Sequence, residues 1–220
     1  MPEGITKEAG IIQSLWNGAW IASLAVGVVV WGLILWACAF HRKRKNTTDA
    51  LPPQVRYNLP IEILYTTVPI IMVAVFFYFT ARDENAITKV TGNPDVKVKV
   101  EGFQWSWRFT SEYQGKVVSV VGTPAQRPVL VLPVQKKVQF DLVSPDVNHS
   151  FWVPAFLFKR DVIPGVKNVF EIETLNKTGE FAGRCAELCG VDHSRMLFTV
   201  KLVPQAEYDQ YVNSQAGSAQ

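Results

Sequence analysis

Two long apolar runs limit what this chain can fold into more than any other feature. The first extends from Leu15 to Phe40, and apart from indole nitrogens its only polar side chains are Asn17 and Ser23. As a helix it would be roughly 39 Å long, enough to cross a membrane core of roughly 30 Å with some tilt. The second runs from Ile61 to about Ala81 and contains Pro69, which a bundle tolerates because neighbouring helices satisfy the freed carbonyl. Together they predict a transmembrane hairpin of two helices.

A secretory signal is the alternative interpretation of the first run, because it also lies near the N-terminus. The run is too long for the apolar region of a signal, and no basic segment precedes it. Trp16 and Trp20 near one end and Trp36 near the other are typical of the aromatic belts at membrane interfaces. These features favour a membrane helix.

The charge of the connection between the runs predicts the orientation. It contains the basic cluster His41–Lys45 and Arg56, opposed only by Asp49, whereas Lys7 is the only base before the first run. By the positive-inside rule the connection is cytoplasmic, and both chain ends lie outside. We therefore expect a multi-pass membrane protein with a cytoplasmic connection between its helices. An outward N-terminus also suggests that a signal segment was removed from, or never included in, this sequence.

The period of the sequence changes after the second run. Val96–Val100 alternates strictly between apolar and charged residues, as a half-buried strand does. Similar runs are separated by turn residues and lie at 129–132, 138–143, 169–173 and 197–203. Such short strands favour an antiparallel sandwich or barrel of roughly one hundred residues. The predicted fold class is thus a two-helix transmembrane hairpin followed by an all-β domain.

Composition agrees with this division of the chain. Hydrophobic residues make up 48% and charged residues 19%, which suits a short membrane part joined to a polar part. The net charge of +3 is small, and without a long basic run it argues against nucleic-acid binding. The expected segments are an N-terminal extracytoplasmic tail (1–14), the hairpin (15–90), the β domain (91–204) and a frayed C-terminal tail (205–220).

The strongest chemical signal is a cluster of potential metal ligands near the C-terminus. Two thiols, an imidazole and a thioether lie within a short stretch, at Cys185, Cys189, His193 and Met196. A second imidazole, His149, is expected at the start of an apolar strand, where a rigid element would hold it. Soft sulfur ligands combined with imidazole favour copper.

Other interpretations of these residues remain open at this level. Cys185 and Cys189 could form a disulfide in an oxidising compartment, or bind zinc together with His149 and His193. A single copper of the blue type would need only one of the two cysteines. Two thiolates that bridge two coppers would use every candidate ligand.

The motif CxExCGxxHxxM at 185–196, with HSFWVP at 149–154, resembles the CuA signature of subunit II of the haem–copper cytochrome c oxidases. The resemblance covers almost the whole chain and implies a cupredoxin-like sandwich for the β domain. It also implies that Cys185 and Cys189 bridge both coppers, that His149 and Met196 complete one copper, and that His193 and the carbonyl of Glu187 complete the other. The Glu187 side chain would bind Mg²⁺ or Mn²⁺ at the interface with subunit I.

The resemblance also implies a function and partners. The protein would be a subunit of a proton-pumping cytochrome c oxidase, together with subunits I and III in the lipid membrane. It would accept electrons from a c-type cytochrome and pass them to the haem–copper centres of subunit I, where O₂ is reduced to water. Two alternatives fit less well. Quinol oxidase subunits lack the ligands, and a membrane-tethered copper chaperone would be thioredoxin-like and would not need His193 or Met196.

Three further residues match family positions. Trp105 resembles the tryptophan through which the electron enters, although Trp105 and Trp107 would share one strand face as ordinary core residues if the strand were regular. Glu62 matches the entrance of a proton pathway, but an acidic residue in the first turn of a helix needs no further role. Asp161 matches a position near the Mg²⁺ site and is equally consistent with a surface loop. Many relatives have an arginine after Pro164-Gly165, where this chain has Val166 and Lys167, so that arginine's role is not carried over.

Overall fold

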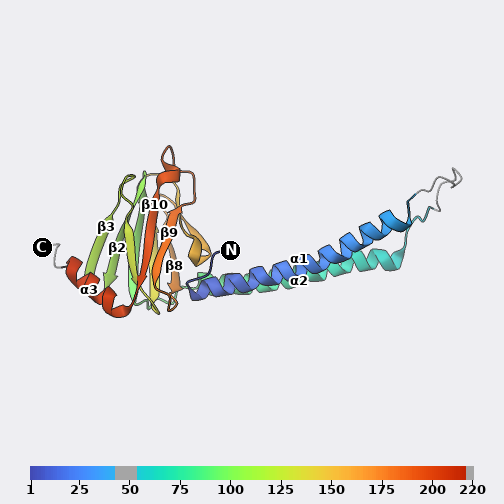
Figure 1. Cartoon of the computed structure of the whole chain (residues 1–220), viewed down its shortest axis with the longest axis horizontal. Helices are drawn as coiled ribbons and strands as arrows, with labels where there is room; N and C mark the ends of the chain where they lie inside the picture. The colour runs from blue at the N-terminus through green and yellow to red at the C-terminus, as the bar shows by residue number, and fades with distance from the viewer. Residues whose placement is uncertain (43–53, 217–220) are drawn as a thin grey trace. The chain divides into compact units, whose positions relative to one another are not determined.

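The computed structural model describes residues 1–42 and 54–216, which form two compact units (Figure 1). One unit comprises residues 14–83, and the other combines residues 1–13 with the chain from Glu84 onwards. The basic cluster extends beyond the described residues, since positions 43–53 lie outside them.

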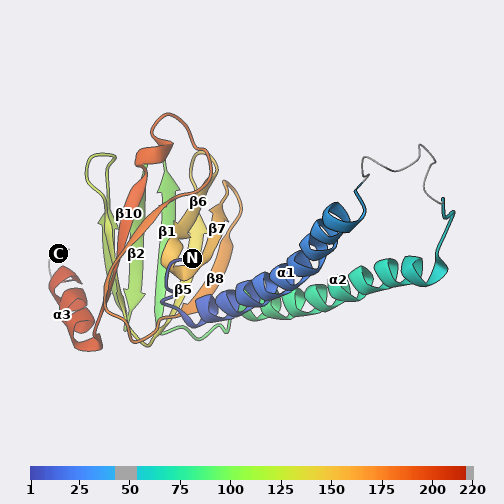
Figure 2. The same ribbon diagram turned by 45° about the vertical axis from the view of Figure 1, so that its right-hand side comes forward.

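The unit of residues 14–83 contains most of two long helices, α1 (Lys7–Phe40) and α2 (Leu59–Thr88). Both are long and apolar enough to cross a membrane, and Pro69 does not end α2. Residues of both helices line one cavity of about 460 Å³ near Ser14 and Asp83, and the helices diverge from there (Figure 2).

Each helix begins before the predicted apolar run because polar side chains cap it. The hydroxyl of Thr6 accepts the amide of Ala9 at 3.1 Å and starts α1. At the start of α2, the carboxylate of Glu62 accepts the amide of Asn58 at 2.9 Å, and the Asn58 side chain accepts the amide of Ile61 at 3.4 Å. These two hydrogen bonds satisfy amides that have no partner within the helix.

The second unit is a sandwich of two five-stranded sheets, which confirms the predicted fold class (Figure 2). One sheet has the order β3-β2-β1-β5-β8 and the other the order β4-β10-β9-β6-β7. Strand bounds are β1 Val96–Phe103, β2 Ser106–Tyr113, β3 Lys116–Val121, β4 Val129–Pro133, β5 Lys137–Val143, β6 His149–Val153, β7 Phe158–Val162, β8 Asn168–Glu173, β9 Gly179–Cys185 and β10 Leu197–Val203. The five runs chosen for their alternation are all strands.

The expectation of purely antiparallel sheets was wrong in two places. Strand β1 pairs with β5 in parallel, and β4 pairs with β10 in parallel. The cause is that the chain crosses between the sheets: β4 belongs to one sheet, and β5 then returns to the other beside β1.

Aromatic side chains fill the space between the sheets. Phe140 stacks on Phe170 at 4.8 Å between ring centroids, and Phe151 stacks on Phe198 at 4.9 Å. Trp107 lies edge-on to both Phe151 and Phe198 and is fully buried. Interlocked rings of this kind leave little room for the framework to move.

Both ends of the chain pack on the sandwich. At the N-terminus, Ile5 is buried and its carbonyl accepts the amide of Leu175 at 2.9 Å. At the C-terminus, the expected frayed tail was wrong for residues 205–216, which form helix α3 (Gln205–Ala216) against β3 and β4. Tyr208 and Val212, one turn apart, are buried there. The other segment boundaries predicted from sequence stay predictions.

Candidate metal centre

The candidate ligands come from two strand ends and one loop. His149 is the first residue of β6 and is fully buried, and Cys185 is the last residue of β9. Cys189, His193 and Met196 lie on the loop from β9 to β10, which contains the short 3₁₀ helix η2 (His193–Arg195). His149 thus lies at the start of a strand, as expected, and the loop carries the other candidates except Cys185.

The donor atoms of these residues surround one small space. The two Sγ atoms are 3.8 Å apart. His149 Nδ1 lies 3.8 Å from Cys185 Sγ, and His193 Nδ1 lies 3.5 Å from Cys189 Sγ. Met196 Sδ is 3.8 Å from Cys189 Sγ, and the carbonyl oxygen of Glu187 is 3.2 Å from Cys185 Sγ. All six positions predicted from the motif are therefore brought together.

This arrangement fits a pair of metal ions better than one. The donors of a single tetrahedral metal, with bonds of about 2.0 to 2.3 Å, would all lie within about 4 Å of one another. The group of donors mutually within 4.8 Å contains His149, Cys185 and Cys189 but not His193. His193, whose Nδ1 lies 3.5 Å from Cys189 Sγ and which also contacts Cys185, is therefore an additional donor beyond that group. The cysteines are free rather than joined in a disulfide.

The surroundings of the two thiols shift their pKa values in opposite directions. Burial alone would raise the pKa of Cys185, but the ring of His149 and nearby backbone groups lower it to about 7. Burial, together with the negative charge of Cys185, raises the pKa of Cys189 to about 12. One thiol thus ionises readily and its charge opposes ionisation of the second. Positive metal ions remove that opposition, since they bind the thiolate forms.

Asp146 is a residue of this site that sequence reasoning missed. Its Oδ1 lies 2.9 Å from His149 Nε2, on the side of the ring away from the thiols, and its Oδ2 accepts the amide of Gln104 at 2.7 Å. Burial would raise the pKa of Asp146, but the amides of Gln104 and Val147 and the His149 ring hold it below its ordinary value. A carboxylate that orients a ligand imidazole is common around metal sites. The only signal in the sequence was its position three residues before His149.

Trp105 lies at the centre as well, and its position removes the conflict with Trp107. Strand β1 ends at Phe103 and β2 begins at Ser106, so Trp105 belongs to the turn between them. Trp107 is a core residue, while Trp105 is partly exposed. The indole Nε1 of Trp105 donates to the carbonyl of Cys189 at 3.1 Å.

Two glycines allow these close approaches. A Cβ at Gly190, whose φ is +123°, would lie 2.9 Å from Trp105 Nε1 and 3.3 Å from Gln104 Nε2. A Cβ at Gly102 would lie 3.3 Å from the His149 ring. Gln104 Nε2 also donates to the Cys189 carbonyl, at 2.9 Å. The absence of a side chain at these two glycines therefore lets the turn between β1 and β2 contact the loop between β9 and β10, and lets β1 contact the His149 ring.

The remaining candidates are less closely tied to the centre. The Glu187 side chain is exposed, although its carbonyl faces Cys185. Asp161 is exposed on β7, opposite Ser150 of β6. Glu62 caps α2 in the other unit, and Cys38 is exposed on α1 without a ligand cluster in the described residues.

Known proteins resemble this chain over nearly its whole length. Residues 96–203 match the family model of the periplasmic domain of cytochrome c oxidase subunit II. A probable cytochrome c oxidase subunit 2 from Streptomyces avermitilis is 49% identical over all of this chain and 80% of its own length. The chain belongs to the cytochrome c oxidase subunit 2 family. A further member, from Mycobacterium bovis, is 40% identical over 96% of this chain and 73% of its own length.

A solved member of the cytochrome c oxidase subunit 2 family supports the β fold. The periplasmic domain of subunit II of cytochrome oxidase from Bradyrhizobium japonicum aligns with a TM-score of 0.51 and 30% identity, covering 58% of this chain and 98% of that one. The family resemblance is thus confirmed, and the chain is a membrane protein with two spans and a periplasmic-type domain. His149, Cys185, Cys189 and Met196 form a copper site of the CuA type.

Proposed function

We propose that this chain is the electron-accepting subunit of a proton-pumping cytochrome c oxidase. In this proposal it binds a dinuclear CuA centre, receives electrons from a c-type cytochrome and passes them to the haem–copper centres of subunit I. The observation behind the proposal is the number of donors in one small space, where two thiols 3.8 Å apart are flanked by two imidazoles, a thioether and a carbonyl. When bound by these residues, a copper centre would supply the storage and release of one electron at a time.

The protein's contribution is to keep the ligands still. Four of the donors are almost fully buried: His149, Cys185, Cys189 and Met196. They are held between a strand end and a core of interlocked aromatic rings, so the ligand positions need change little between redox states. Exclusion of water also reduces the solvent rearrangement that a change of charge would otherwise require.

Trp105 is the proposed residue through which the electron enters. Support comes from its partial exposure together with the hydrogen bond from its indole to the Cys189 carbonyl, which links the surface to a ligand residue directly. The route is short, and it uses no other side chain.

The exposed Glu187 side chain is the proposed ligand for Mg²⁺ or Mn²⁺ shared with subunit I. Its carbonyl lies 3.2 Å from Cys185 Sγ while its carboxylate is free to reach a neighbouring subunit. Subunit III and membrane lipid would complete the surroundings. A role for Glu62 at the entrance of a proton pathway is part of the proposal, although its capping bond already accounts for its position.

Metal content of the full chain tests the copper assignment. We expect about two coppers per chain in the unmodified protein, loss of the dinuclear centre in Cys189→Ser, and retained copper with a changed redox potential in Met196→Leu. Cys38→Ser is the matched control, because it removes an exposed thiol far along the chain. A single metal per chain, or a preference for one zinc over copper, would contradict the assignment of a dinuclear copper centre.

The proposed topology puts the β domain on the outer side of a bacterial plasma membrane. A protease site inserted in the turn at Gln114 and Gly115, between β2 and β3, should be cut when protease is added to intact protoplasts. Cutting only after lysis would show that the orientation is the reverse of the one proposed.

A further inference from the structure

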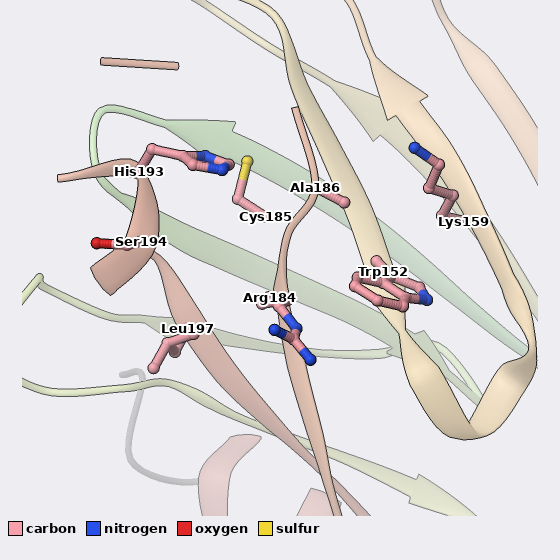
Figure 3. A pocket seen from close by; sticks show the side chains of 8 residues that line it. All are labelled: Trp152, Lys159, Arg184, Cys185, Ala186, His193, Ser194 and Leu197. Atoms are coloured by element: carbon pink, nitrogen blue, oxygen red, sulfur yellow. The ribbon is translucent and has the colours of Figure 1, made fainter. Parts of the chain in front are cut away.

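Two cavities of similar size lie in different parts of this chain. One, of about 500 Å³, belongs to the metal centre, and Figure 3 shows Cys185 and His193 on its wall. The other, of about 460 Å³, is lined by residues of α1 between Ser14 and Ala22 and of α2 between Ile71 and Asp83. Cavities of this size are typical of small-molecule sites. The proposed function gives no role to the second cavity, which we call the hairpin groove.

The hairpin groove is open because α1 carries small side chains along it. Ser14, Gly18 and Ala22 follow one another at intervals of four residues, and all three line the groove. Glycine in a membrane helix commonly lets two helix backbones approach closely. Here a Cβ at Gly18 would meet no described atom within 4 Å outside its own helix backbone. Gly18 therefore leaves space beside α2 instead of bringing the two helices together.

The length of the hairpin groove matches one leaflet of a bilayer. Along α2 the lining residues extend from Ile71 to Asp83, about 18 Å at 1.5 Å per residue. Along α1 they extend from Ser14 to Ala22, about 12 Å by the same measure. Half of a hydrocarbon core of about 30 Å is about 15 Å. A transmembrane helix of another chain would need a groove of about twice this length, whereas one acyl chain of a lipid fills a single leaflet.

The hairpin groove is apolar along its length and charged at one end. Val75, Phe76 and Phe79 line its apolar part on α2. At the charged end, the guanidinium of Arg82 lies 4.8 Å from the centroid of the Phe79 ring. The carboxylate of Asp83 is almost covered, with 10% of its side chain exposed, whereas 56% of the Arg82 side chain is exposed. An amphiphile with its hydrocarbon chain in the groove would therefore place its headgroup beside Arg82 and Asp83.

The contacts of Arg82 and Asp83 indicate which headgroup would fit. Arg82 Nε donates to Asp83 Oδ1 at 2.8 Å, and Nη2 lies 2.7 Å from the same oxygen. Further guanidinium donors and a second carboxylate oxygen can thus face a ligand. A guanidinium matches a phosphate through its planar fork, and a carboxylate accepts hydrogen bonds from a primary ammonium. A headgroup with phosphate alone would place its negative charge against Asp83, whereas one with phosphate and ammonium satisfies both side chains.

We propose that the hairpin groove binds one phosphatidylethanolamine molecule, with an acyl chain beside Gly18, the phosphate on Arg82 and the ammonium on Asp83. The lipid fills space between α1 and α2 that would otherwise lack packing partners, and lost van der Waals contacts along such a space would weaken the hairpin. The site is separate from the copper centre, because every residue that lines it belongs to the hairpin unit.

Native mass spectrometry of the detergent-purified full chain tests this proposal. The chain is given equal amounts of dioleoyl phosphatidylethanolamine and dioleoyl phosphatidylglycerol. We expect one phosphatidylethanolamine retained per chain, in about tenfold preference to phosphatidylglycerol. Arg82→Gln should weaken retention about tenfold, and Asp83→Asn should remove the preference, because hydrogen bonds between charged groups are worth about that factor. Gly18→Leu should abolish retention, since the leucine side chain fills the groove.

Gly27→Leu is the matched control, because Gly27 also has open space around it on α1 but does not line the hairpin groove. Unchanged copper content in every variant will show that the β domain is intact. Equal lipid loss in the two glycine variants would place the lipid elsewhere and contradict the proposal. Equal retention of the two lipids by the unmodified chain would contradict it too. A dimer of the chain that Gly18→Leu dissociates would show that a second copy occupies the groove instead.

Discussion

Asp146 connects two functions of the centre at the scale of single residues. One carboxylate oxygen meets the imidazole of His149, and the other accepts the amide of Gln104, next to Trp105. The same side chain therefore orients a copper ligand and holds the turn that carries the tryptophan. Since both oxygens receive N–H groups, no neutral amide can replace the carboxylate without turning a donor toward a donor.

We predict that Asp146→Asn weakens copper binding roughly ten- to a hundredfold, the usual loss when the partner of a ligand imidazole is removed. The redox potential should rise, because removal of a negative charge disfavours the more positive oxidised state. Copper titration and potentiometry of the full chain measure both effects. Asp95→Asn, which also removes a carboxylate bonded to a backbone amide, is the control. Equal results for the two variants would contradict the role given to Asp146.

At the scale of elements, the ligand loop and the turn between β1 and β2 work as one unit. The turn donates two hydrogen bonds to the Cys189 carbonyl, from Gln104 and Trp105, and Gly190 leaves the space for both. Any side chain at position 190 would have to displace the indole or distort the loop. The contact between the two elements therefore depends on that glycine.

Gly190→Ala should slow reduction of the centre by the donor cytochrome between roughly ten- and a hundredfold while copper is retained, because the indole is pushed from the Cys189 carbonyl. Stopped-flow reduction measures the rate. Gly115→Ala is the control: it also places alanine at a positive φ, here +75°, but in open space away from the ligands. If the copper centre were reduced as fast in Gly190→Ala as in Gly115→Ala, Trp105 would not be the residue through which the electron enters.

Sequence patterns predicted the elements whose residues alternate cleanly and missed those that do not. Strand β9 was missed because it contains Gly179 and Gly183, and glycine has low strand preference. The fold needs a glycine at position 183, since a Cβ there would lie 2.1 Å from the Phe198 ring. Helix α3 was missed because polar residues surround the buried pair Tyr208 and Val212. In both, packing against the rest of the domain decides the structure, and local composition does not reveal it.

The candidate site was more predictable than its surroundings for a chemical reason. Metal ligands must be of particular residue types, so their identities and spacing survive in the sequence as a motif. Asp146 and Gln104 act through hydrogen bonds between segments far apart in the chain, and many polar residues could make such bonds. Trp105 was found by resemblance, but only the position of the turn explained how it avoids the face that Trp107 occupies.

At the scale of the whole molecule, the chain joins a membrane hairpin to a rigid β domain that contains the copper site. Residues 1–13, which precede the first membrane run, belong to the same compact unit as the sandwich. Each of the two units is internally well defined, and all six proposed ligand positions lie in the sandwich unit. The proposed function therefore depends on which metal ions that one site binds.

Electron paramagnetic resonance of the oxidised, copper-loaded full chain is the most direct test of whether the site binds a dinuclear copper centre. We expect a multiline hyperfine pattern from one unpaired electron shared equally by two coppers, and loss of that pattern in Cys189→Ser. A four-line spectrum of a single copper, or no signal from a fully loaded protein, would contradict it.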